Sequence, residues 1–192
     1  MTTQQHTDGW FVVRIREGDI QALGKLYERY KALVYRTALA VTSDERAAED
    51  ILQDVFLRVY KYADRIDETL VLAPWLYRVT VNSAYTWTNR AKRWLYFIQD
   101  TLDPAQQHPE ARVEEIEQHQ AILRAIDTLS PAQRVTIVLH YLEGLSLREI
   151  SAVMDVSEGT VKSRLHYARE KLRRVILEQR RRLAPEVAYD FT

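Results

Sequence analysis

Two helices separated by a tight turn are indicated by residues 147–174, which read LREISAVMDVSEGTVKSRLHYAREKLRR. Apolar residues recur at steps of three and four on both sides of residues 155–157, and this short segment interrupts the pattern. Ala152, Val153 and Val156 are placed to pack in the angle between the two helices. The stretch therefore predicts a helix-turn-helix, a motif whose second helix commonly lies in the major groove of DNA.

Helices are expected along the remainder of the chain as well. Among 192 residues there are only five Gly and five Pro, and strong helix formers fill long stretches. Residues 43–62 show the clearest amphipathic pattern, and Ser43 or Asp44 can cap this helix. Its apolar stripe consists of Ala48, Ile51, Leu52, Val55, Phe56, Val59 and Tyr62. Further helices are expected within residues 10–41 with a break at Gly18-Asp19, over 75–97 and 113–128, and after a cap at Ser130. We expect essentially no β-strand.

A polar segment divides the chain into two parts. Residues 99–112 contain three dipeptides typical of loops, Asp103-Pro104, Gln106-Gln107 and His108-Pro109, with little apolar content. We therefore expect an all-α protein with two small helical domains joined by a flexible linker, the C-terminal domain carrying the helix-turn-helix. The predicted boundaries are residues 1–97 for the first domain, 98–113 for the linker and 114–192 for the second domain with a short C-terminal tail.

The composition argues against several classes of protein. The chain has no Cys, which removes disulfides, thiolate zinc sites and a Cys nucleophile. Its N-terminus is polar and no run of about 18 apolar residues occurs, so we expect a cytoplasmic protein that does not insert into a membrane. The five His lack metal-ligand spacing, and there is no glycine-rich phosphate loop or nucleophile elbow. We expect neither an enzyme, nor a cofactor, nor a small-molecule substrate.

Positive charge is concentrated in two segments, although 27 Lys plus Arg balance 27 Asp plus Glu overall. Residues 156–182 contain nine basic and three acidic residues, and residues 75–94 contain four basic residues, no acidic one and five aromatics. Basic helices attract phosphates, and exposed rings stack on unpaired bases at about 1–3 kcal/mol per base. For either segment alone, a solvated face over an aromatic core is an equally good interpretation. The two segments together favour a nucleic-acid partner, including single-stranded DNA.

Motifs in the C-terminal half carry a family resemblance. The sequences LSP at 129–131, LSLREI at 145–150 and GTVKSRL at 159–165 closely resemble the fourth conserved region of the small sigma factors of bacterial RNA polymerase. In that family the region reads the minus-thirty-five promoter element. The resemblance implies contacts to this element from Glu158, Thr160, Lys162, Ser163, Arg164 and His166.

The N-terminal half independently resembles the second region of the same family. AEDILQDVF at 48–56 is similar to the helix that binds core RNA polymerase, and PWLYRV at 74–79, followed by Asn82, is similar to the promoter-melting segment. The loop 66–73 and Asn82 resemble the place where the family captures a flipped base. The resemblance implies core contacts from Asp50, Gln53, Asp54, Leu57 and Arg58, and minus-ten DNA contacts from Arg78, Asn82, Tyr85, Arg90, Lys92 and Arg93.

The short distance between the two motif regions leaves no room for the middle domain of larger sigma factors, which implies the extracytoplasmic-function subgroup. The resemblance then implies a sigma factor that directs promoter-specific transcription initiation and has core RNA polymerase, promoter DNA and an anti-sigma factor as partners. Two departures from the common pattern, at residues 81–88 and at His166-Tyr167, leave the promoter consensus open. A stand-alone helix-turn-helix regulator and a helical adaptor without a DNA role are the alternatives, but the regulator leaves the N-terminal half unexplained.

Overall fold

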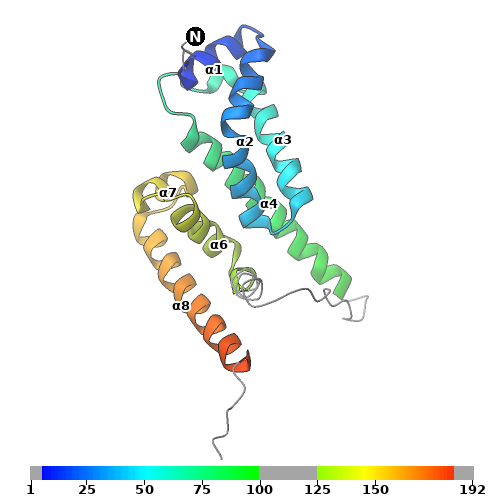
Figure 1. The fold of residues 1–192 in the computed structure, drawn as a ribbon, viewed down its shortest axis with the longest axis vertical. Helices are drawn as coiled ribbons and strands as arrows, with labels where there is room; N and C mark the ends of the chain where they lie inside the picture. The colour runs from blue at the N-terminus through cyan, green and yellow to red at the C-terminus, as the bar shows by residue number, and fades with distance from the viewer. Residues whose placement is uncertain (1–5, 100–124, 184–192) are drawn as a thin grey trace, which may run out of the picture.

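The computed structural model describes residues 6–99 and 125–183, and every regular element in these ranges is helical (Figure 1). The N-terminal part contains α1 (Asp8–Arg16), α2 (Ile20–Thr42), α3 (Glu45–Lys61), the 3-10 turn η1 (Ala63–Arg65) and α4 (Ala73–Gln99). The C-terminal part contains α6 (Pro131–Ile137), the π-helical turn η2 (Val138–Leu142), α7 (Leu147–Met154) and α8 (Glu158–Leu183). The predicted all-α fold is confirmed. Residues 100–113 of the predicted linker and 113–124 of the helix expected there lie outside the described residues.

The helices begin where polar side chains can satisfy their free backbone N–H groups. The side chain of Asp19 accepts hydrogen bonds from the backbone at the start of α2, and Asp44 does the same for α3. Ser130 and Ser146 form reciprocal capping boxes at the starts of α6 and α7. The caps expected from the sequence at Asp19, Asp44 and Ser130 are therefore present.

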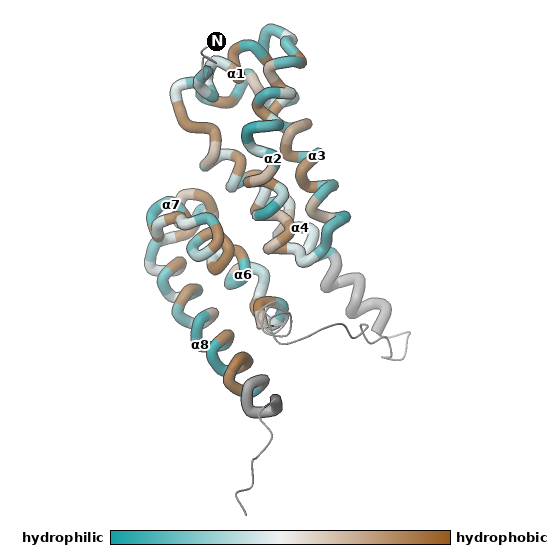
Figure 2. Tube along the Cα trace, in the orientation of Figure 1, coloured by the Kyte–Doolittle hydropathy of each residue, from teal (hydrophilic) through white to brown (hydrophobic). Residues whose placement is uncertain are grey.

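The N-terminal helices form a bundle in which α2, α3 and α4 pack side by side and α1 crosses one end (Figure 1). The predicted apolar stripe of α3 faces this core, with Ala48, Val55 and Val59 fully buried and Leu52 and Tyr62 half-buried. The opposite face of α3 is polar and solvent-exposed (Figure 2). The bundle thus leaves one face of α3 exposed to solvent.

The C-terminal helices form the predicted helix-turn-helix, with α7 and α8 packed against each other and α6 packed against α8. Asp155 ends α7 in the left-handed conformation (φ 54°), a conformation that Asp tolerates better than most residues. Ile150, Val161 and Leu165 close the angle between the helices. Of the three residues expected there, Val153 is buried and Val156 is half-buried, whereas Ala152 is exposed. The second helix continues to Leu183, because no Gly or Pro interrupts the sequence between Gly159 and Pro185.

The two parts of the molecule contact each other directly. Helices α6 and α7 pack against α4, and η2 packs against α2, so that α8 lies on the side away from the bundle (Figure 1). Buried apolar residues from both parts belong to one continuous cluster. Across the described ranges, none of the helices combines the length and apolar character that a bilayer crossing requires.

Candidate nucleic-acid interface

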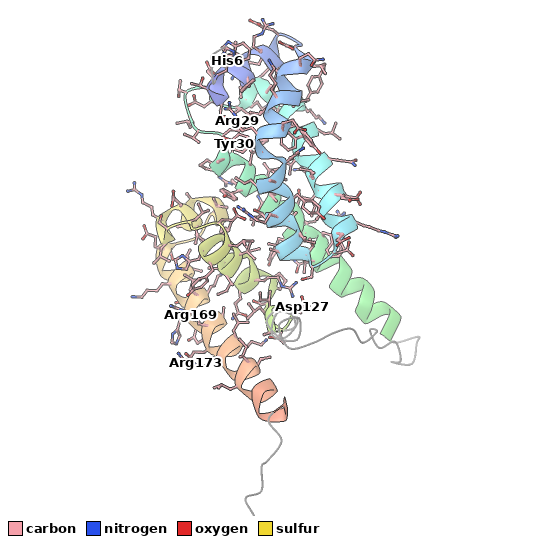
Figure 3. The ribbon with its side chains drawn as sticks, in the orientation of Figure 1. His6, Arg29, Tyr30, Asp127, Arg169 and Arg173 are labelled. Atoms are coloured by element: carbon pink, nitrogen blue, oxygen red, sulfur yellow. The ribbon has the colours of Figure 1, made fainter. Side chains whose placement is uncertain are left out.

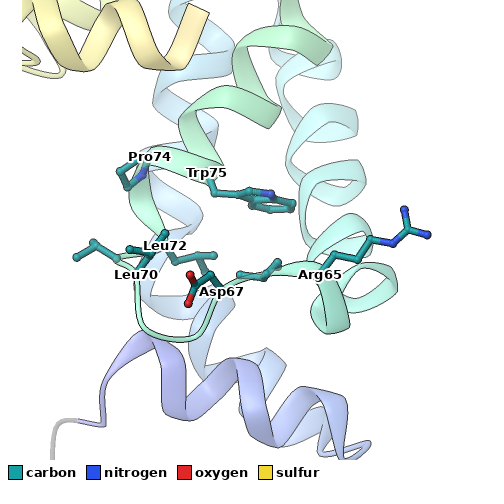
Figure 4. Close-up of a pocket in the computed structure, with 8 residues that line it drawn as sticks. Arg65, Asp67, Leu70, Leu72, Pro74 and Trp75 are labelled. Atoms are coloured by element: carbon teal, nitrogen blue, oxygen red, sulfur yellow. The ribbon is translucent and has the colours of Figure 1, made fainter. Parts of the chain in front are cut away.

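A cavity of about 400 Å³ lies beside the loop that connects η1 to α4. Its apolar lining comes from the end of this loop, which is hydrophobic in Figure 2, and from the rings of Pro74 and Trp75 in the first turn of α4. Leu70 and Val71 are 64% and 69% exposed, which is unusual for side chains of this kind. Figure 4 shows Trp75 on the opposite side of the cavity from Asp67 and Leu72. The lining residues are Arg65, Ile66, Asp67, Leu70, Val71, Leu72, Pro74 and Trp75.

The cavity loop is shaped by its own polar residues. The Asp67 carboxylate accepts hydrogen bonds from the backbone N–H of Thr69 at 2.9 Å and from the Thr69 hydroxyl at 2.6 Å. These bonds lower the pKa of Asp67, so this carboxylate is ionised at neutral pH. The resulting turn directs Leu70 and Val71 into solvent, where a flat apolar ligand such as a nucleobase can reach them.

Exposed residues continue from the cavity along α4. Trp75, Arg78, Asn82 and Tyr85 follow one another at steps of three, four and three, which places them along one side of the helix. We call these four residues the α4 stripe. Trp75 is half-buried, whereas Arg78, Asn82 and Tyr85 are exposed. Asn82 does not line the cavity, so the loop and Asn82 form adjacent parts of one surface rather than a single pocket.

The structure describes the side chains of only some of the basic residues that are predicted to contact minus-ten DNA. Arg90 is exposed on α4, and the side chains of Lys92 and Arg93 lie outside the described part. Arg78 forms an exposed ion pair of 3.6 Å with Asp155 of the helix-turn-helix. Trp75 lines the cavity and also packs against the hydrophobic core, while Leu76 is fully buried.

The polar face of α3 contains all five residues predicted to contact core polymerase. Asp50, Gln53, Leu57 and Arg58 are exposed, and Leu57 is 66% exposed although it is apolar. Asp54 is half-buried and accepts hydrogen bonds from Arg58 Nε at 2.9 Å and from Ser83 Oγ at 3.3 Å. The face therefore combines carboxylates and an amide around one exposed leucine.

In the N-terminal half of α8, one row of side chains faces the hydrophobic core and another row faces solvent. Val161, Leu165 and Ala168 are buried. The outward residues are Glu158, Lys162, Ser163 and His166, all of them exposed. This arrangement leaves four of the six predicted minus-thirty-five residues free to meet a DNA groove.

The other two predicted residues of α8 already have intramolecular contacts. The Thr160 backbone donates a hydrogen bond to Ser157 Oγ at 3.1 Å, and its hydroxyl lies 2.9 Å from the same oxygen. Arg164 is half-buried beside the Met154 sulfur. Farther along α8, Arg169 and Arg173 are exposed (Figure 3). In the two described ranges, no group of three His, Asp or Glu side chains is arranged to hold a metal ion.

Comparison with known proteins matches both parts of the chain. The models of Sigma-70 region 2 and Sigma-70 region 4 match residues 26–94 and 119–172. The ECF RNA polymerase sigma factor SigW of Bacillus subtilis (strain 168) is 30% identical over 176 residues, which cover 85% of this chain and 93% of the relative. The protein belongs to the ECF sigma factors. The ECF RNA polymerase sigma-E factor of Escherichia coli (strain K12) is also 30% identical to this sigma factor, over 88% of this chain and 94% of the relative.

Solved structures share the fold of this sigma factor. CnrH in complex with the cytosolic domain of CnrY has a TM-score of 0.63 at 23% identity and covers 88% of this chain and 96% of its own. The sigma factor RpoE from Bartonella quintana, in complex with NepR, has a TM-score of 0.60 at 23% identity and covers 76% and 90%. Because region 2 matches residues 26–94, the protein is a transcription initiation factor of RNA polymerase and not a stand-alone helix-turn-helix regulator.

Proposed function

We propose that this sigma factor uses three separate surfaces, one for core polymerase, one for the minus-ten element and one for the minus-thirty-five element. Residues 1–97 hold core polymerase and open the minus-ten element, residues 114–192 read the minus-thirty-five element, and residues 98–113 connect the two. The observation that carries the proposal is the apolar cavity at the start of α4, which continues into the exposed α4 stripe. A cavity for a flat ring beside an arginine, an amide and a tyrosine suits an unpaired strand of DNA.

The polar face of α3 is the proposed polymerase-binding surface. Asp50, Gln53 and Leu57 project from a helix whose opposite face is fully used by the core, so a partner can bind here without disturbing the bundle. Leu57 supplies the buried apolar contact of such an interface. Asp54 and Arg58 form an ion pair with each other and lie on the same face as Leu57.

The proposed minus-ten surface separates base capture from strand positioning. The cavity receives one flipped base of the non-template strand, and Asn82 offers amide donor and acceptor groups to the edge of a neighbouring base. Arg78 and Arg90 contact phosphates, which positions the strand without specifying its sequence. Tyr85 supplies an exposed ring on the path between them. Lys92 and Arg93 are assigned to phosphates by their sequence position alone.

For the minus-thirty-five element, we assign the outward row of α8 to the major groove. Lys162, Ser163 and His166 are exposed close to the start of α8, which is the part of a recognition helix that meets base edges. Glu158 lies in the first turn, where a carboxylate can accept a hydrogen bond from a cytosine amino group. Thr160 and Arg164 contact DNA on the same surface after DNA contacts replace their present intramolecular ones.

Regulation by an anti-sigma factor in the cytoplasm belongs to the same proposal. The structural neighbour RpoE was solved in complex with the anti-sigma factor NepR, and its fold is shared by this chain. The exposed surfaces of α3 and α8 are the ones that such a protein would need to cover in order to block transcription.

Reconstituted run-off transcription with core polymerase tests the division of labour. We expect Gln53→Ala to weaken binding to core polymerase by about tenfold, since it removes a contact at the centre of that face. We expect Asn82→Ala to leave core binding unchanged and to reduce open-complex formation by about tenfold, the effect of one base contact. Gln21→Ala, at an exposed position of α2, is the control and should behave like the wild type. If the wild-type protein does not join core polymerase even at low salt, the proposal is wrong.

A further inference from the structure

Helix α1 precedes the part of the chain that the region 2 family model matches, yet it contacts the cavity loop directly. Asp8 Oδ2 accepts a hydrogen bond from the backbone N–H of Leu72, a residue that lines the cavity, at 3.1 Å. The same oxygen accepts a hydrogen bond from the Tyr30 hydroxyl at 2.5 Å, and Oδ1 accepts one from Arg29 Nη1 at 2.7 Å. Arg29 and Tyr30 are neighbours on α2 (Figure 3). Asp8 thus connects α1, α2 and the end of the loop.

The beginning of the loop is held by α1 as well. Arg16 Nε donates a hydrogen bond to the carbonyl oxygen of Ala63 at 2.9 Å, and its Nη2 donates to the carbonyl of Ile66 and to the Glu68 carboxylate. Between these anchors the loop lies on the helix backbone, because a Cβ added to Gly9 would be 1.9 Å from the carbonyl oxygen of Glu68. The loop therefore has fixed contacts with α1 at its start, its middle and its end.

The pKa values of Asp8 and Tyr30 determine which of the two groups is charged and which donates the hydrogen bond. Burial disfavours the ionised carboxylate, but the hydrogen bonds from Tyr30, Arg29 and the Leu72 backbone outweigh it and lower the pKa of Asp8. Burial and the hydrogen bond to Asp8 raise the pKa of Tyr30. At neutral pH Asp8 is therefore a charged acceptor and Tyr30 a protonated donor, and charge-assisted bonds of this kind are the stronger ones.

We propose that Asp8 is a positioning residue for base capture, which it supports by holding the Leu72 end of the cavity loop in place. The inference rests on the proposed function, since it takes the cavity as the site of the flipped base. A loop with exposed apolar side chains would lose binding free energy if it had to be ordered each time a base entered. Fixing it against α1 before DNA arrives removes that loss.

Binding of single-stranded non-template minus-ten oligonucleotides to the holoenzyme tests the proposal. Each base in turn is replaced by an abasic site. For the wild type we expect one position at which the missing base weakens binding by at least about tenfold, the effect of one stacked base. In Asp8→Ala this position-specific loss should fall below about threefold, whereas Asp8→Asn, which retains an acceptor for the Leu72 N–H, should restore most of it. Glu28→Gln, which removes an exposed carboxylate on α2, is the matched control.

A second variant reaches the loop without touching the Asp8 network. Gly9→Ala favours the helix but forces the Glu68 carbonyl away, so it should reduce the same position-specific loss. Equal losses at every position in the wild type would show that base capture itself is wrong, and the positioning role would fall with it. A local loss in the wild type that Asp8→Ala and Gly9→Ala both retain would overturn the positioning role alone.

An independent observation concerns the contact between the two parts of the molecule. The side chain of Glu143, which follows η2, has no solvent exposure. Its Oε1 accepts hydrogen bonds from Arg36 Nε at 3.0 Å and from Thr37 Oγ1 at 3.1 Å, and its Oε2 accepts from Arg36 Nη2 at 2.6 Å and from the Tyr77 hydroxyl at 2.8 Å. All three partners belong to the N-terminal bundle. One buried carboxylate of the C-terminal part is thus fully satisfied by α2 and α4.

The contact is incompatible with simultaneous reading of two promoter elements. The minus-ten and minus-thirty-five elements are about 25 base pairs apart, or roughly 85 Å of duplex at 3.4 Å per base pair. Here, by contrast, Arg78 of the α4 stripe is 3.6 Å from Asp155 of the helix-turn-helix. We infer that the Glu143 contact is a lock that keeps the two DNA-binding parts together in the free protein and opens when polymerase and promoter separate them. This second inference also relies on the proposed function.

Distance measurements on the free full-length protein test the lock without any transcription assay. The chain has no Cys, so Glu28→Cys on α2 and Glu170→Cys on α8 allow specific labelling for single-molecule energy transfer. We expect the otherwise wild-type protein to show one high-efficiency population. Glu143→Ala and Arg36→Ala, which break the contact from opposite sides, should each raise the low-efficiency population at least about tenfold.

Asp155→Asn is the matched control, because its partner contact with Arg78 is long and exposed and should contribute little. Asn is also tolerated in the left-handed conformation at this position. The two disrupting variants lie in different parts of the molecule. The same effect in both therefore indicates opening of the contact rather than a folding defect in one part. If both variants retain the wild-type efficiency distribution, the lock is wrong.

Discussion

Arg134 carries a positive charge into the contact between the two parts of the molecule, where it is only 5% exposed. Its Nη1 donates a hydrogen bond to the carbonyl oxygen of Val41 at 3.1 Å, and its Nη2 pairs with Asp127 at 3.0 Å. Burial lowers the pKa of Arg134, and its Nε has no hydrogen-bond partner among the described residues. The side chain is thus well anchored but not fully satisfied.

We expect Arg134→Ala to reduce the free energy of unfolding by about 2–4 kcal/mol, because it leaves the Val41 carbonyl without its partner and opens a cavity. Arg134→Met should cost about half as much, since it fills the space and removes the charge that burial disfavours. Urea denaturation followed by circular dichroism measures both. Arg173→Ala, on the exposed face of α8, should stay within about 0.5 kcal/mol. A larger loss for Met than for Ala would contradict this account.

Single residues show where the sequence stops being informative. Arg78, Asn82 and Tyr85 of the α4 stripe and the exposed row of α8 were identified through the family resemblance, and helical spacing then places each set on one side of its helix. Asp8, Arg134 and Glu143 could not be found in this way, because their partners are far away along the chain. Glu143 and Arg36, for example, are 107 positions apart. Their roles depend on tertiary packing, and their residue types are common on any helix surface.

Among the elements, the helices were predictable where a cap and an apolar stripe coincide. Asp44 and the stripe of α3 specify both the start and the buried face of that helix. The π-helical turn η2 was not predictable, because its widened hydrogen bond, from Glu143 N–H to the Val138 carbonyl, alters periodicity for only one turn. That turn lies immediately before Glu143 and sets the direction in which the lock residue leaves the helix. An element with little sequence signal therefore contributes to the contact between the two parts, together with α6 and α7.

On the scale of the whole molecule, the sequence predicted two helical parts but not their packing. Composition and periodicity describe how each part buries its own core, whereas the contact between them combines buried apolar residues of both parts with a few polar groups that are far apart in the sequence. On separation the polar groups regain hydrogen bonds to water, which reduces the free energy that opening costs. The arrangement suits a protein that must hold its two DNA-binding parts together at one stage and apart at another.

Acidification should open the molecule. Burial disfavours the charged form of Glu143, but hydrogen bonds from Arg36, Tyr77 and Thr37 outweigh it and lower its pKa below the ordinary 4.5. Because the pKa is lower in the closed form than in the open form, the carboxylate stabilises closure above 4.5, and this contribution is lost as the pH falls through the closed-state value. Arg36 stays charged and Tyr77 protonated over this range, and Glu149 is the other acidic group that acts on Tyr77. Energy transfer in the doubly labelled protein should therefore fall on acidification more steeply in the wild type than in Glu143→Gln, whose side chain does not titrate. Superimposable pH curves for the two proteins would show that Glu143 does not control the opening.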